Sequence, residues 1–165
     1  MSGSEKQTVE ESLKQWLTDA KKVVVAGVGN PFRKDDNVGV KIVQGLKTKV
    51  SNKVFLIEAE TIPESYMNQI AKFKPTHILL VDAGIINQPA GTSQLAETKQ
   101  LMRKTSISTH TLPLRIFCDY LTETTHAIIG LLIIQPQDTR FGEGLTPKLK
   151  KTAEMLTSLL VKLLP

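Results

Sequence analysis

Cysteine is nearly absent from this 165-residue chain: the single Cys118 excludes an intrachain disulfide framework and a cysteine-based zinc knuckle. Long apolar runs are absent too. The richest, Ala127 to Ile134, is far shorter than the roughly 18 residues of a membrane span. The N-terminal residues are polar, which predicts no signal peptide and no membrane insertion. Together these absences lead us to expect a cytoplasmic protein.

Aromatic residues are also scarce, at 5% of the chain, and they do not interleave with the basic residues. The formal charge of +5 comes from 21 Lys and Arg against 16 Asp and Glu. Nucleic-acid binders concentrate such charge on one face. Here the basic residues are spread along the chain, which indicates a solvated surface, and we expect no nucleic-acid partner.

Strand and helix patterns alternate along a single predicted domain that covers residues 1–165. Residues 1–7 form a tail, and a helix over 8–21 begins at a Thr8–Glu11 capping box. Alternation of this kind predicts an α/β fold, a three-layer α/β/α sandwich with a mostly parallel sheet of about five strands and an extra N-terminal helix. The predicted strands cover residues 22–28, 53–59, 77–81, 93–97 and 126–134, and further helices begin near Val38, Pro63, Thr111 and Pro147.

A glycine-rich turn, Gly27 to Gly39, follows the first predicted strand, where open α/β sheets place ligands. Turns that bind dinucleotides offer bare backbone N–H groups and a helix dipole to a phosphate. This turn carries Asp35 and Asp36, which repel a phosphate and attract a cation. It also lacks the full Gly-x-Gly-x-x-Gly pattern, so a mononucleotide-binding domain is disfavoured.

Two further polar groups lie near strand or helix ends: Asp82 after the third strand and His110 before a helix. Because parallel strands end at one edge of the sheet, Asp36, Asp82 and His110 are expected to converge there. Two carboxylates and an imidazole suit nickel, iron, zinc or manganese. The simpler interpretations are a turn role for Asp82, helix capping by Asp35 and Asp36, and a helix-start or core role for His110.

Other candidate groups are weaker. Cys118 lies in a helix beside Phe117 and is predicted to be a small buried residue, not a nucleophile. His77 and His126 precede strand cores, at the opposite strand ends from the proposed site, so both are predicted to be structural. The hydroxyls next to His110 do not form a strand–Ser–helix nucleophile elbow.

Four motifs, in order, resemble those of the nickel-iron hydrogenase maturation endopeptidases, in the branch that processes the hydrogenase-3 (formate hydrogenlyase) large subunit. The first is Gly27-Val28-Gly29-Asn30 followed by Asp35-Asp36 and Gly39. The others are the apolar strand ending in Asp82-Ala83, Thr109-His110 before Pro113-Leu114, and Ile134-Gln135-Pro136. The resemblance covers about residues 22–164 and implies a phosphorylase/hydrolase-like form of the sandwich.

The resemblance implies an aspartyl-type endopeptidase that reads nickel already installed in a hydrogenase large-subunit precursor and removes its C-terminal peptide. By motif, Asp36, Asp82 and His110 contact the nickel, Asp36 and Asp82 are catalytic, and Gly27, Gly29, Asn30 and Asp35 support them. The resting enzyme, expected to be a monomer, then holds no tightly bound metal, because the substrate supplies it. Asn37 replaces a frequent glycine of the family's motif, and Arg33 and Lys34 add positive charge beside the acidic pair.

Two alternatives belong to other classes. A peptidyl-tRNA hydrolase also opens with a strand and Gly-x-Gly-Asn-Pro, but its catalytic His follows about ten residues later, and this chain has none before His77. A non-catalytic nickel- or hydrogenase-binding maturation factor would use the same three ligands. Loss of a C-terminal peptide from the precursor distinguishes the enzyme from the binding factor.

Overall fold

A computed structural model describes residues 7–97 and 111–165. One sheet contains five strands in the order β2-β1-β3-β5-β4, and all neighbours are parallel except β4 and β5. This confirms the predicted mostly parallel sheet. The strands are β1 (Val23–Val28), β2 (Val54–Glu60), β3 (His77–Ala83), β4 (Ser93–Glu97) and β5 (Ile128–Ile134).

The central strands are apolar at almost every position because helices cover both faces of the sheet. All residues of β1 and β3 are buried, as are all of β5 after Ile128. Successive residues of a strand point to opposite faces. Val23 and Val25 therefore belong to one core cluster, and Val24 and Ala26 belong to the other.

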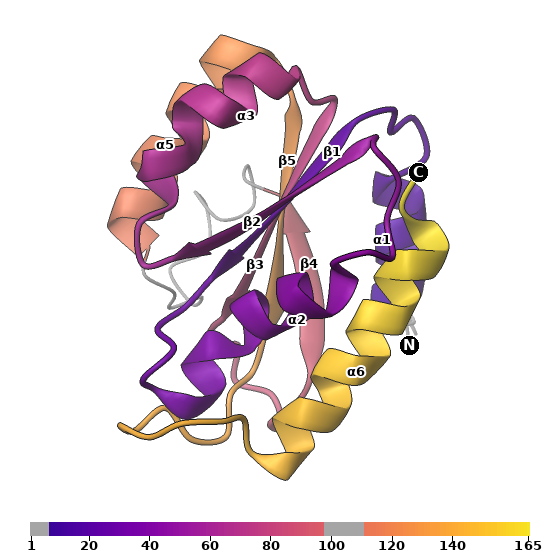
Figure 1. The fold of residues 1–165 in the computed structure, drawn as a ribbon. Coiled ribbons are helices and arrows are strands. Elements are labelled where there is room, and N and C mark those ends of the chain that lie inside the picture. Colours follow the sequence, from indigo (N-terminus) through magenta and orange to yellow (C-terminus); the bar gives the residue numbers. More distant parts are fainter. Residues whose placement is uncertain (1–6, 98–110) are drawn as a thin grey trace, which may run out of the picture.

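The helices form two outer layers (Figure 1), which completes the expected three-layer sandwich. On one face lie α1 (Val9–Trp16), α2 (Val38–Leu46) and α6 (Pro147–Leu163); on the other lie α3 (Met67–Phe73) and α5 (Thr111–Thr125). Short 3-10 helices, η1 (Lys34–Asn37) and η2 (Pro63–Tyr66), precede α2 and α3. In the residues described, no helix combines the length and apolar character needed to cross a membrane.

The N-terminal helix α1 begins at the predicted capping box, in which Thr8 and Glu11 bond each other's backbone N–H. Trp16 is buried, as expected of a core anchor, and its ring meets that of His77 edge-on with centroids 4.9 Å apart. The prediction that the helix covers 8–21 is wrong at its end. The helix stops at Trp16 because the chain turns into the sheet, where Thr76 accepts the N–H of Lys21 and Lys22.

Candidate functional site

The strand order places a topological switch point between β1 and β3. From β1 the chain returns through α2 to β2 on one side, while β3 pairs with β1 on the other. In open α/β sheets, ligands bind at the carboxyl ends of the strands beside such a reversal. Asp36 lies in the segment that follows β1, and Asp82 lies at the end of β3, so the two residues follow or end the strands that flank the switch point.

Asp36 lies in η1, is 8% exposed, and is held by the turn that precedes it. Its Oδ2 accepts the backbone N–H of Asn30 at 2.9 Å. Asn30 Oδ1 in turn accepts the N–H of Phe32 at 2.9 Å. Gly29 has φ +152°, and a Cβ there would lie 2.1 Å from the Asp36 carbonyl oxygen. The glycine of the motif therefore allows the turn to fold back on the residue that carries the carboxylate.

Asp82 is the one charged residue of β3 and is fully buried. A close backbone contact brings its strand against the segment that carries Asp36. A Cβ on Gly39, the second residue of α2, would lie 2.0 Å from the carbonyl oxygen of Val81. No side chain fits there, and η1 contacts β3 directly. The two motif glycines thus let the Asp36 and Asp82 segments pack together.

His110, the third predicted ligand, lies outside the described residues, so its place in the site stays a prediction. Residue 111, which follows it in sequence, begins α5. Within residues 7–97 and 111–165, no three His, Cys, Asp or Glu side chains form a group able to hold a metal ion.

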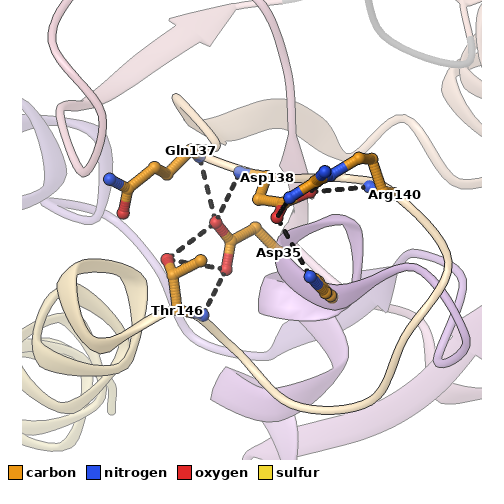
Figure 2. Close-up of polar contacts among 6 residues, drawn as sticks. Asp35, Gln137, Asp138, Arg140 and Thr146 are labelled. Carbon is orange, nitrogen blue, oxygen red and sulfur yellow. Dashed lines mark hydrogen bonds and ion pairs between the residues drawn. The ribbon is translucent and has the colours of Figure 1, made fainter.

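Asp35 binds a segment distant in the sequence, the β5–α6 loop of residues 135–146 (Figure 2). Its carboxylate accepts the backbone N–H of Gln137 and Asp138, each at 3.0 Å. It also accepts the N–H of Thr146 at 2.7 Å and the Thr146 hydroxyl at 2.8 Å. Both aspartates lie in the first turn of η1, as the simpler interpretation of the sequence expects, but the bonds of Asp35 go to the loop and not to the helix that follows.

Thr146 is the N-cap residue of α6, and Pro147 follows it at the helix start, as predicted. Its hydroxyl, however, bonds Asp35 and not the backbone of its own helix. The first turn of α6 and the first turn after β1 are therefore joined by one buried carboxylate.

A second polar cluster, which the sequence analysis missed, lies on the same loop. Asp138 accepts from the Arg140 guanidinium at 2.9 and 3.0 Å and pairs with Lys34 Nζ at 3.0 Å. The hydrogen bonds from Arg140, with the Lys34 ammonium second, hold the pKa of Asp138 well below its usual range. The only signal in the sequence was Gln137-Asp138 at a strand end, which is an ordinary turn pattern.

Two of the remaining candidates, Cys118 and His77, have structural roles. Cys118 is 5% exposed, and burial raises the pKa of its thiol to about 12, so the thiolate nucleophile does not form near neutral pH. His77 is buried at the amino end of β3, away from the carboxyl edge, and burial lowers its pKa. Both observations agree with the sequence prediction for these residues.

The family model described as hydrogenase maturation protease matches residues 40–163. The chain belongs to the hydrogenase maturation protease family. It is 31% identical over 164 residues to a Methanocaldococcus jannaschii protein with the same family name, covering 94% of this chain and 96% of the relative. It is 26% identical over 131 residues to the Hydrogenase 3 maturation protease of Escherichia coli K12, covering 79% and 83%.

Solved structures agree with this membership. The crystal structure of the [NiFe] hydrogenase maturation protease HycI from Thermococcus kodakarensis KOD1 superposes with a TM-score of 0.84 at 34% identity. The match covers 93% of this chain and 98% of that one. These relatives are hydrogenase maturation proteases. The comparisons therefore favour an endopeptidase over the peptidyl-tRNA hydrolase alternative.

Proposed function

We propose that this family member is an endopeptidase that recognises nickel in the precursor of a nickel-iron hydrogenase large subunit and removes its C-terminal peptide. The observation that supports the proposal is the placement of two enclosed carboxylates, Asp36 and Asp82, at the switch point of the sheet. A hydrogenase maturation protease needs to distinguish a finished metal centre from an unfinished one, and carboxylate oxygens with an imidazole suit a divalent transition metal.

In this proposal the nickel belongs to the substrate, and the resting enzyme carries no metal of its own. Asp36, Asp82 and His110 occupy open coordination positions of the nickel when the precursor docks. A precursor without nickel offers these groups nothing to bind, so selection follows from coordination chemistry. Hydrolysis then adds one water across the scissile peptide bond and releases a carboxylate and an amine.

Two routes can activate the water. The nickel can polarise the scissile carbonyl or lower the pKa of a bound water. Alternatively, the Asp36 carboxylate takes the proton as general base. The variant Asp36→Asn distinguishes the two routes, because it keeps an oxygen ligand for the metal but removes the base. Under the second route it abolishes turnover and keeps nickel-dependent binding. Under the first route it does not abolish turnover while binding is kept.

The test compares cleavage of nickel-loaded and nickel-free precursor by the wild-type enzyme, Asp82→Asn and His110→Ala. Mass spectrometry of the precursor measures the loss of the C-terminal peptide. We expect the wild type to cleave only the nickel-loaded form and both variants to be at least about 100-fold slower, the scale of losing a group that acts in the transition state. His126→Ala and Glu123→Gln, at exposed positions, are matched controls that retain activity.

Equal cleavage of both precursor forms by the wild type would contradict the nickel-reading proposal. Nickel-dependent binding without any loss of the peptide would instead identify a non-catalytic maturation factor.

A further inference from the structure

Exposed large apolar side chains occur in the loops that follow the carboxyl ends of the parallel strands. Four of them follow the carboxyl ends of four different parallel strands: Phe32 after β1, Ile62 after β2, Ile85 after β3 and Phe141 after β5. Phe141 is 73% exposed and Phe32 is 63% exposed. Neighbouring exposed apolar side chains, unlike single scattered ones, mark a place where another molecule binds, and of these four residues Phe32 and Phe141 lie on neighbouring loops.

Phe32 and Phe141 belong to two loops that are bonded to each other. The Gly142 N–H donates to the Phe32 carbonyl at 2.9 Å, and the Lys34 N–H donates to the Gly142 carbonyl at 3.1 Å. Arg33 lies between these bonds, with its guanidinium carbon 4.4 Å from the centroid of the Phe141 ring. We call Phe32, Arg33 and Phe141 the docking cluster.

The docking cluster is exposed, yet its base is rigidly held. The buried Asp35 carboxylate binds three backbone N–H groups of the β5–α6 loop, and Asp138 ties Lys34 to that loop. An exposed aromatic ring on a pre-organised loop loses little conformational entropy when it binds. Arginine and aromatic residues are the types enriched at the energetic centres of protein interfaces.

The charge of Arg33 is available to a partner. In the described part of the chain, no carboxylate forms an ion pair with Arg33, whereas Lys34 and Arg140 both pair with Asp138. Stacking on an aromatic face leaves guanidinium N–H groups at the rim of the ring able to donate. The surface that complements the docking cluster is therefore an apolar patch with an Asp or Glu beside it.

A shallow depression lies on the loop that carries Phe141. It has a volume of about 660 Å³ and is lined by Gln137, Asp138, Thr139, Arg140, Thr146 and Pro147. The same loop therefore offers a partner protein an exposed ring to bury and a depression to fill.

We propose that the docking cluster binds the folded body of the hydrogenase large-subunit precursor, at an apolar patch flanked by an acidic residue, and so presents the scissile segment to Asp36 and Asp82. This inference rests on the proposed function, because it takes the same precursor as the partner. In this inference Phe32, Arg33 and Phe141 contribute affinity for the precursor protein, whereas the carboxylates recognise the nickel and take part in the hydrolysis.

The experiment measures kcat and KM for cleavage of nickel-loaded precursor by the wild type, Phe141→Ala, Phe32→Ala and Arg33→Gln. The matched control is Ile128→Ala, because Ile128 is 52% exposed but begins β5 at the opposite edge of the sheet. We expect KM to rise at least about tenfold for Phe141→Ala, in the range of an interface hot spot, with kcat within about twofold of the wild type. Ile128→Ala leaves both constants unchanged.

The salt dependence adds a second readout. Added salt raises KM more for the wild type than for Arg33→Gln, because the variant has lost the charge that salt screens. We expect thermal melts to show that each variant is folded, because the replaced side chains are mostly solvent-exposed.

An unchanged KM for both Phe141→Ala and Phe32→Ala, in an assay where the wild type cleaves the precursor, overturns the docking inference and leaves the proposed function intact. Absence of cleavage by the wild type is a failure of the proposed function itself.

Discussion

The carboxylate of Asp35 accepts the backbone N–H of Thr146 at 2.7 Å, across 111 residues of sequence. This bond joins the turn that carries Asp36 to the N-terminus of the last helix. Asp36 is the next residue, so the bonds of Asp35 help to fix the backbone that carries the candidate catalytic carboxylate. The two neighbouring aspartates thus have different roles: Asp35 binds the backbone of the β5–α6 loop, whereas Asp36 is a residue of the candidate site.

Substitution of Asp35 is expected to cost stability as well as activity. Asp35→Ala removes the acceptor of three backbone N–H groups and a hydroxyl, which we expect to lower the free energy of unfolding by about 3 kcal/mol. Thr146→Val removes only the hydroxyl and keeps the backbone bond, with an expected loss of about 1 kcal/mol. Urea unfolding measures both values, and equal losses for the two variants would contradict the proposed role of Asp35.

The contact between α2 and β3 is expected to tolerate no side chain at Gly39. A Cβ there would lie 2.0 Å from a backbone oxygen, so Gly39→Ala must push the helix off the strand, at a cost of about 3 kcal/mol. Gly45→Ala, on the same helix, meets only the Thr157 side chain at 3.0 Å and gains helix propensity, and its stability stays within about 1 kcal/mol of wild type. Thermal unfolding of the two variants provides the comparison.

The thiol of Cys118 is expected to be unreactive in the folded protein. Burial raises the pKa of its thiol to about 12, so a thiol reagent such as DTNB should label it only after unfolding. Cys118→Ala should retain precursor cleavage, with a modest loss of stability from the small cavity. Rapid labelling of the folded protein, or loss of cleavage by a folded Cys118→Ala variant, would reopen the assignment of this residue as structural.

Buried His77 is expected to make stability depend on pH. Burial lowers the pKa of His77 from 6.5, so the unfolded chain binds more protons than the folded one below that pH. Stability is therefore greatest above pH 6.5 and falls as the solution is acidified toward the lower pKa of the folded state. The carboxyls with lowered pKa, Glu58 and Asp138, contribute only in more acidic solution, where their usual values of 4.5 and 3.8 lie.

Urea unfolding at pH 7.5, 6.5 and 5.0 tests this slope. His77→Gln should flatten it, whereas His126→Gln, at an exposed position, should preserve it. A wild-type protein that is equally stable at pH 5.0 and 7.5 would show that His77 is not kept neutral by burial.

The strands of the sheet were largely predictable, because the pattern that specifies each strand lies within a few consecutive residues. A strand covered on both faces needs an apolar side chain at nearly every position, and such runs locate β1, β3 and β5 to within about two residues. The capping box likewise located the start of α1. Its end was not predictable, because the chain leaves the helix where Thr76, a residue of another segment, accepts the next backbone N–H groups.

By itself, the sequence determined the α/β class, the parallel strands and the two carboxylates that come to their common edge, because apolar periodicity and turn glycines act within a few residues. Only the tertiary structure decided that Asp35 binds the β5–α6 loop and that Phe32, Arg33 and Phe141 share one surface. Those contacts join residues more than a hundred positions apart, and no local propensity encodes them. They arise when the sheet and its helices pack and bring the loops at one edge within hydrogen-bonding distance.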